Sequence, residues 1–256
     1  MNTFKVLIVV LIGYGVTYMY GVASTRYELF PYNVLSGLIL SDEVLTPSKT
    51  HGAKGPALYE KLQQGGYIIY FRHNHREKAQ DTRLFDALAH LTETEIVHPT
   101  YKDGLCLSEY GEKQNWYLSR VFSALALPIG KVISSPICRC VQTAEGIFGR
   151  VDELDYDMIY KTILPQDKID EIYARRREAL EQLPAAGTNT VVVAHSSPSL
   201  HAVGLNVPEL VEGGAVVLKP EENGEIHFVT MLKPRDWIHL LEQKPISEAE
   251  SLTQVL

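Results

Sequence analysis

The sequence predicts an α/β fold of three layers, in which a mostly parallel sheet has helices on both faces and is preceded by an N-terminal apolar helix. From residue 55 onward, apolar segments with strand character alternate with segments of helical periodicity. The stretch TVVVA at Thr190–Ala194 is continuously apolar, as expected for a strand that is buried on both faces of a parallel sheet. With 256 residues, 45% of them hydrophobic, the chain can form one sizeable domain or at most two small ones.

The first half of this domain alternates between helices and strands. Pro56–Gln64 has helical character and stops at a Gly-Gly pair, after which the apolar Tyr67–Phe71 is expected to be the first strand. Ser108–Leu125 opens with a capping-type Ser-x-x-Gly-Glu and continues with apolar residues at helical spacing. Lys131–Ser134 is expected as the second strand, and Val141–Phe148 as the helix that follows it.

The second half continues the alternation and ends in a hairpin. Gln166–Leu183 is a charged segment that predicts an exposed helix, because Pro and Gly follow it. Thr190–Ala194 is the third strand. Ala215–Lys219 and Ile226–Met231 are expected to pair around a turn-forming segment, and Pro234–Leu241 to form a short last helix.

The N-terminal segment Val6–Ala23 contains eighteen residues without a charge. The apolar core of a signal peptide has about 7–15 residues and a spanning helix about 20, so this segment falls between the two. Gly21-Val22-Ala23 resembles a cleavage site, whereas Tyr18 and Tyr20 suit the outer interface of a membrane anchor. We expect an uncleaved anchor, with a cleaved signal as the alternative.

These features divide the chain into an anchor or signal segment (1–23), a tether (24–54), a globular domain (55–242) and a polar tail (243–256). Because the cationic N-terminus should remain in the cytoplasm, the domain is expected to face the periplasm or the exterior, anchored in the inner membrane. Signal cleavage would instead leave it secreted or periplasmic. The net charge of −7, with no Lys/Arg cluster, argues against nucleic acid as a partner.

Four residues with suitable chemistry follow the three central strands. Arg72 and His73 come at the end of the first strand, Arg139 shortly after the second and His195 directly after the third. In open α/β sheets, ligands bind beyond the carboxyl ends of the strands, so these side chains should converge. Guanidinium groups match phosphate oxygens, and a neutral imidazole can attack phosphorus. The four residues therefore indicate phosphoryl transfer.

The motifs around these residues resemble those of the histidine phosphatase superfamily, which has the phosphoglycerate-mutase-like fold. The similarity lies in FRH after the first strand, SSPICRCVQTAE after the second and VVAHS at the third. The segments GGYIIYFRH, LSEYGEKQ, IGKVISSPICRCVQTAEGIFG and EGGAVVLKP resemble exported bacterial members more closely. The resemblance covers Pro56–Trp237 and implies hydrolysis of a phosphomonoester through a phosphohistidine, without a metal or cofactor.

Residue by residue, the resemblance makes His73 the nucleophile and assigns Arg72 and Arg139 to the phosphate. It makes His195 the second pocket histidine, which hydrogen-bonds the phosphoryl oxygens. The implied substrate is a phosphorylated small molecule, glycan or protein.

Further residues are expected on the substrate side of the pocket, namely Arg76, Asn74 and Ser196. The chain departs from the family pattern at Asn74, where a small residue is usual, at Cys140, where Thr or Ala is common, and at Ser196, where Gly is commoner. None of these departures removes a catalytic group.

The general acid is expected in the acidic segment RVDELDYDMIY, because expulsion of an alkoxide requires a nearby carboxylic acid. We place Glu153 first and Asp155 second. Further candidates are Asp152, Asp157, Glu209 and Glu212.

Two other functions fit parts of the sequence. His73 and His75 could bind one metal ion together with His195, as in a metal-dependent hydrolase, if the first strand continued as far as His75. Alternatively, the unusual Asn74 and the open choice of general acid fit a weak or inactive domain that binds a phosphorylated ligand or a partner.

The three cysteines, Cys106, Cys138 and Cys140, lack the spacing of a zinc site. In an oxidising compartment they predict one disulfide and one thiol, with Cys106 joined to either of the other two. The resemblance to exported relatives implies the Cys106–Cys138 pair and a free Cys140.

Overall fold

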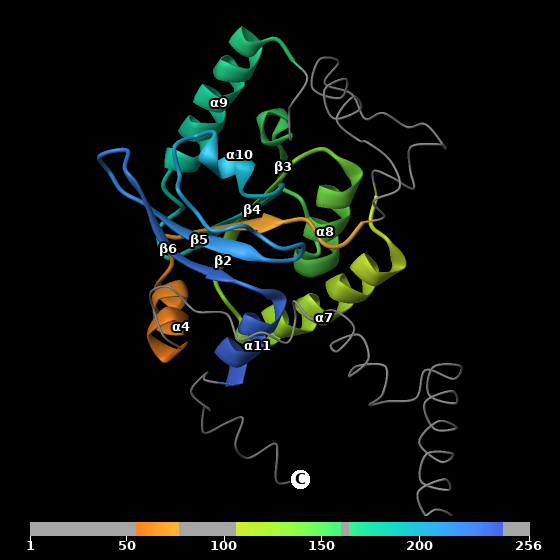
Figure 1. The fold of residues 1–256 in the computed structure, drawn as a ribbon. Helices are drawn as coiled ribbons and strands as arrows, with labels where there is room; N and C mark the ends of the chain where they lie inside the picture. The colour runs from red at the N-terminus through yellow and green to blue at the C-terminus, as the bar shows by residue number, and fades with distance from the viewer. Residues whose placement is uncertain (1–54, 77–105, 160–163, 243–256) are drawn as a thin grey trace, which may run out of the picture. The chain divides into compact units, whose positions relative to one another are not determined.

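A computed structural model describes residues 55–76, 106–159 and 164–242 of the chain (Figure 1). Its helices are α4 (Gly55–Gln64), α7 (Glu109–Leu125), α8 (Cys138–Phe148), α9 (Gln166–Glu181), α10 (Pro198–His201) and α11 (Pro234–Glu242), with a 3₁₀ turn η1 (Tyr156–Met158). Its strands are β1 (Ile68–Arg72), β2 (Ile129–Ser134), β3 (Glu153–Leu154), β4 (Asn189–Ala194), β5 (Ala215–Pro220) and β6 (Ile226–Leu232).

The six strands form one sheet in the order β3-β2-β4-β1-β5-β6. Strand β4 lies between β1 and β2 and is parallel to both, and β2 is also parallel to β3. Strand β5 is antiparallel to both β1 and β6. The expected mostly parallel sheet and its C-terminal hairpin are therefore confirmed. The sequence did not predict β3, η1 or α10, which are each too short to show a periodicity.

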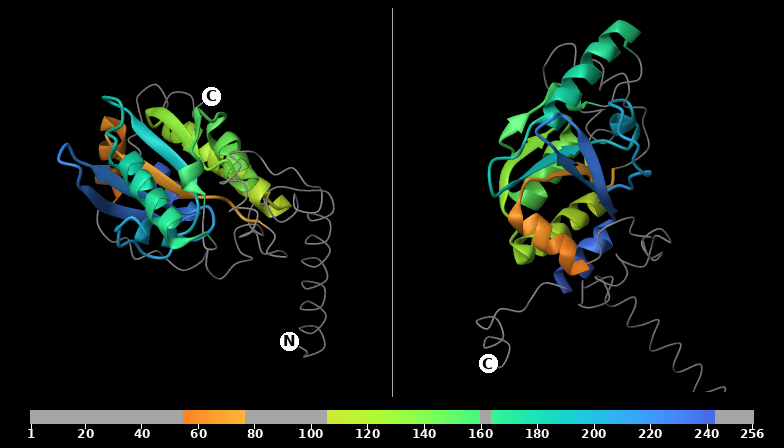
Figure 2. Two further views of the ribbon diagram at one scale, coloured as in Figure 1. Left: turned by 90° about the horizontal axis from the view of Figure 1, so that it is seen from above. Right: turned by 90° about the vertical axis from the view of Figure 1, so that its left-hand side faces the viewer.

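Helices cover both faces of the sheet, which makes three layers. Ile69 and Phe71 of β1 pack in a core cluster with α4, α7, α8 and α11, whereas Ile68 and Tyr70 pack in a second cluster with α9, α10 and η1. This alternation follows from the two-residue period of a strand. Figure 1 and the right-hand view of Figure 2 show α9 and α4 on opposite sides of the strands.

The first core cluster is rich in aromatic side chains. The fully buried Trp237 of α11 stacks on Phe71, with ring centroids 5.8 Å apart, and also meets Phe122 of α7. Aromatic pairs of this kind contribute about 0.5–1.5 kcal/mol beyond their buried area. They hold α7 and α11 against the strand that ends in the candidate site.

The start of α7 is attached to the chain that leaves β1. Ser108 caps the helix by accepting a hydrogen bond from the Gly111 N–H, at 3.2 Å, as the capping-type sequence predicted. The Ser108 N–H donates to the carbonyl of His75, at 3.1 Å. A Cβ atom at Gly111 would collide with that same carbonyl, so glycine is required for this close approach.

All the described residues lie in one compact unit, which spans Ser48–Leu256. None of the helices in this described part is long and apolar enough to cross a membrane. The expected anchor Val6–Ala23, the whole tether and the polar tail lie outside the described residues, so their assignments stay predictions.

Candidate active site

Three neighbouring parallel strands place the candidate residues at one edge of the sheet. Arg72 of β1 pairs with Ala194 of β4, and Ser134 of β2 pairs with Val193, so the three carboxyl ends lie side by side. His73 and His195 directly follow two of these ends. Arg139 lies in the first turn of α8, which begins at Cys138, three residues before the expected start.

His73 is 4% exposed, and its ring is neutral in this environment. Burial lowers its pKa well below the usual 6.5, and the positive charges of Arg139 and Arg72 lower it further. The Nδ1 atom lies 2.7 Å from the carbonyl oxygen of Asn74, which can only accept a hydrogen bond. The proton of the neutral ring is therefore on Nδ1, and Nε2 carries the lone pair.

His195 has the opposite tautomer. Its Nδ1 atom lies 3.3 Å from Nη2 of Arg139, a group that can only donate, so the proton of the neutral ring is on Nε2. This Nε2 is 3.2 Å from Oγ of Ser135 and 3.8 Å from Sγ of Cys140. Burial lowers the pKa of His195 well below 6.5, as do the charge of Arg139 and, to a lesser degree, His73.

Three arginines, Arg72, Arg76 and Arg139, lie near enough to His73 for their charges to lower its pKa. Arg139 is 2% exposed and contacts His195 directly. Arg72 donates from Nη1 to the carbonyl of Leu210, at 2.7 Å, and from Nη2 to Oε1 of Glu212, at 3.1 Å. Its buried Nε has no hydrogen-bond partner among the described residues. Arg76 is near enough for its charge to lower the pKa of His73.

Of the two residues Asn74 and Ser196, which were expected on the substrate side, the first is buried and the second is partly exposed. Asn74 is fully buried, and its amide Nδ2 donates to Oδ1 of Asn115 on α7, at 2.7 Å. This differs from the substrate contact expected from the sequence, because the amide nitrogen is already held inside the protein. Ser196 is partly exposed beside His195, and its carbonyl accepts the N–H of Ser199 at the start of α10.

The candidates for the general acid occupy different environments. Glu153 is exposed on β3 and forms an ion pair with Lys131. Asp155 is half-buried, and burial raises its pKa above the usual value, with a contribution from the negative charges of Asp157 and Glu153. Burial thus shifts the pKa of Asp155 in the direction that a general acid requires, whereas Glu153 is held in an exposed ion pair.

Three of the other acidic candidates have defined partners, and the fourth, Glu209, is exposed. The N–H of Val132 and the Arg150 guanidinium hold the pKa of Asp152 below its usual value. Asp157 is paired with Arg175. Glu212 forms an ion pair with Arg72, the arginine that the resemblance assigns to the phosphate.

His75 connects the loop after β1 to α7. Its N–H donates to Oε1 of Gln114, its Nδ1 lies 2.6 Å from Oγ of Ser108, and its ring packs edge-on against Tyr110. The metal hypothesis required His73 and His75 to lie on one face of a continuing strand. Strand β1 ends at Arg72, so the two histidines do not share a strand face. Within the described ranges, no cluster of His, Cys, Asp and Glu is arranged to hold a metal ion.

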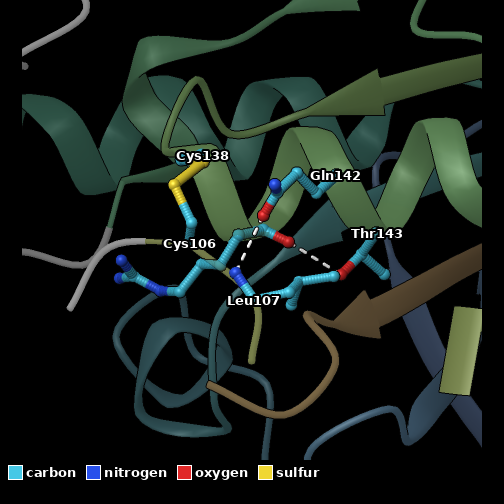
Figure 3. The surroundings of a disulfide bond; sticks show 6 residues. Cys106, Leu107, Cys138, Gln142 and Thr143 are labelled. Carbon is cyan, nitrogen blue, oxygen red and sulfur yellow. Dashed lines mark hydrogen bonds between the residues drawn. A yellow bond between two sulfur atoms is a disulfide. The ribbon is translucent and has the colours of Figure 1, made fainter. Parts of the chain in front are cut away.

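A disulfide joins Cys106 to Cys138, with the Cα atoms 4.8 Å apart (Figure 3). The expected pairing is therefore confirmed, and Cys140 is a buried thiol that donates to the carbonyl of Ala194. Next to the bridge, the N–H of Leu107 donates to Oε1 of Gln142 on α8, at 2.8 Å. These contacts attach the chain before α7 to the helical turn that carries Arg139.

Two polar residues near the site were missed in the sequence. Thr143 accepts the Asn74 N–H, at 2.9 Å, and donates to the carbonyl of Arg139, at 2.7 Å. Its position four residues after Arg139, on the same face of a helix, is a signal that could have found it. Asn115 lies on a different element from Asn74, and no local pattern connects the two.

No family model matches the chain, and no curated protein matches it either. Solved structures similar to it include the protein histidine phosphatase SixA complexed with tungstate, at 16% identity over 66% of this chain and 98% of that one, with a TM-score of 0.39. A mycobacterial glucosyl-3-phosphoglycerate phosphatase with VO3 has 14% identity over 65% and 98%, with a TM-score of 0.44. A phosphoserine phosphatase from Entamoeba histolytica has 13% identity over 66% and 98%, with a TM-score of 0.41.

These structures come from the superfamily that the motifs resemble. Their identities and TM-scores are low, so the similarity concerns the fold and not the activity of this chain.

Proposed function

We propose that this protein is a phosphomonoesterase that transfers the phosphoryl group of its substrate to Nε2 of His73 and then to water. The observation that carries the proposal is the state of His73, a neutral ring with its proton on Nδ1 and a lone pair on Nε2. Buried beside the guanidinium of Arg139 and close to His195, this ring combines a nucleophile with positive charge for the phosphate.

In the first step, Nε2 of His73 forms a bond to phosphorus, and the bond from phosphorus to the ester oxygen breaks. The phosphorylated ring becomes positively charged, and the Asn74 carbonyl stabilises this charge through Nδ1–H. Arg139 and the unpartnered Nε of Arg72 neutralise the phosphoryl oxygens. Water then attacks phosphorus and gives a proton to the carboxylate that protonated the leaving oxygen, the electron pair of the N–P bond returns to Nε2, and inorganic phosphate leaves.

The leaving oxygen takes its proton from a carboxylic acid. Asp155 is favoured by its raised pKa, and Glu212 by its contact with Arg72. The variants Asp155→Asn and Glu212→Gln distinguish the two candidates. The variant that lacks the general acid should lose most activity toward alkyl phosphate esters. It should keep more activity toward p-nitrophenyl phosphate, whose leaving group needs no proton.

We further propose that the site works outside the cytoplasm, with Val6–Ala23 as its membrane anchor. The disulfide between Cys106 and Cys138 supports this location, because such bonds persist in oxidising compartments. The substrate class remains a phosphorylated small molecule, glycan or protein.

The full-length protein tests the activity directly. It should release phosphate from p-nitrophenyl phosphate in the presence of a chelator, and His73→Ala should abolish the release. His75→Ala is the matched control and should keep most of it, since His75 contacts α7 rather than the site. Equal loss in both variants, or inactivation by the chelator, would contradict the assignment. Vanadate binding without turnover would favour a ligand-binding domain instead.

A further inference from the structure

The buried amides of Asn74 and Asn115 form a directed chain of hydrogen bonds. Asn74 Nδ2 donates to Asn115 Oδ1, at 2.7 Å, and Asn115 Nδ2 donates to the carbonyl of Gln142, at 2.8 Å. Because that carbonyl can only accept, the orientation of the Asn115 amide is determined, and with it the orientation of Asn74. The chain of bonds connects the loop after β1 to α8 through α7.

Two glycines make room for this amide pair. A Cβ atom at Gly146 of α8 would collide with Nδ2 of Asn115, and a Cβ atom at Gly213 would lie 2.6 Å from Oδ1 of Asn74. Gly213 also donates its N–H to the carbonyl of His73, at 3.1 Å. The backbone around His73 is therefore shaped to accept the Asn74 side chain.

The main chain of Asn74 is held as firmly as its side chain. Its N–H donates to Oγ1 of Thr143, which in turn donates to the carbonyl of Arg139. Its carbonyl accepts the Nδ1–H of His73. The residue that determines the tautomer of His73 is thus linked to the helical turn of Arg139 both by its backbone and, through Asn115, by its side chain.

We propose that Asn74 and Asn115 are a pair of positioning residues that hold the Asn74 carbonyl against Nδ1 of His73 and keep the His73 ring in register with Arg139. The pair touches no reacting atom. The inference rests on the proposed function of His73 as the nucleophile, but the state of the ring can be measured without any turnover.

The test uses Asn74→Ala, Asn115→Ala and the double variant of the full-length protein. Nitrogen-15 NMR of the imidazoles should show His73 protonated on Nδ1 in the wild type and a mixture of tautomers in the variants. The single-turnover rate of His73 phosphorylation by p-nitrophenyl phosphate should fall about tenfold, whereas the Kd for vanadate changes less than about threefold. The double variant should be no worse than the single ones, because the two residues act as a unit.

A matched control separates positioning from stability. Asn189 is also fully buried, and it donates to the carbonyl of Leu62 at the opposite end of the sheet. Asn189→Ala should lower stability and leave the His73 tautomer and phosphorylation rate unchanged.

Gly146→Ala provides a second route if an asparagine variant does not fold. Its methyl group displaces the Asn115 amide, whereas alanine favours the helix more than glycine does. It should reproduce the tautomer mixture and the slower phosphorylation.

Unchanged His73 spectra in the Asn74, Asn115 and Gly146 variants, or an equal change in Asn189→Ala, would overturn the inference. If the wild type phosphorylates nothing, the proposed function fails, and the spectra still decide whether the pair determines the tautomer.

Discussion

The imidazole rings of His73 and His195 lie edge to face, 5.6 Å apart between centroids, and their neutral forms carry the proton on opposite nitrogens. The Asn74 carbonyl determines the tautomer of the first ring, and the Arg139 guanidinium that of the second. His73 therefore offers a lone pair at Nε2, whereas the Nε2–H of His195 faces Oγ of Ser135, at 3.2 Å. Arg139 holds the His195 ring beside the nucleophile, and its charge lies where a phosphoryl group would carry negative charge on its oxygens.

The two lowered pKa values predict how stability depends on pH. As the pH falls below about 6.5, histidines of the unfolded chain take up protons, but His73 and His195 in the folded protein do not. The unfolded state then binds more protons, so the free energy of unfolding falls by up to about 1.4 kcal/mol per pH unit for each ring.

Urea unfolding at pH 6 and pH 5 measures this difference. His195→Gln should lose less stability over this interval than the wild type, and a variant of the exposed His227 to Gln should behave as the wild type does. An identical pH dependence in wild type and His195→Gln would show that the ring is not held neutral.

Arg139→Lys tests the geometry of the phosphate site. Lysine keeps the charge but cannot reproduce the planar fork that contacts His195 and matches phosphate oxygens. We expect kcat/KM and vanadate affinity to fall about 10–100-fold. The control is Arg150→Lys on the exposed pair with Asp152, which should change neither quantity. Full vanadate affinity in Arg139→Lys would remove Arg139 from the phosphate site.

The disulfide should stabilise the domain and leave one thiol. The two cysteines are 32 residues apart in the sequence. In the chain-entropy model, closing a loop of this length adds about 3–4 kcal/mol to the free energy of unfolding. Cys106→Ser should lower the free energy of unfolding by about that amount, measured by urea titration. Mass spectrometry of the unreduced protein should find a Cys106–Cys138 peptide and an unmodified Cys140. A peptide that joins Cys106 to Cys140 would contradict the pairing.

Membrane topology tests the proposed location. A reporter fused after Leu256 should be active outside the cytoplasm, and the protein should sediment with membranes, because Val6–Ala23 is apolar throughout. A soluble, shortened protein that begins near Ser24 would identify a cleaved signal instead, and a reporter active only in the cytoplasm would reject export.

Strand ends were the part of the site that the sequence could predict. Apolar runs such as Thr190–Ala194 identify buried parallel strands, and parallel strands bring their carboxyl ends to one edge. The sequence therefore predicts that His73 and His195 lie at the same edge of the sheet. The start of α8 was set too late, because Cys138, Arg139 and Cys140 show no helical periodicity.

Contacts between distant elements could not be predicted in this way. Asn74 and Asn115 are separated by 41 residues, and neither has a local pattern that names its partner. The acidic segment placed Glu153 ahead of Asp155, but in the structure Glu153 pairs with Lys131 and Asp155 is partly buried. Burial and charge pairing of single side chains depend on tertiary packing, which periodicity does not report.

The position of phosphate on the protein tests the central claim most directly. The full-length protein is mixed with p-nitrophenyl phosphate, quenched within one turnover and mapped by mass spectrometry under conditions that preserve acid-labile phosphate. We expect phosphate on His73 in the wild type and none in His73→Ala. Phosphate on another residue, or undiminished turnover in His73→Ala, would contradict the account.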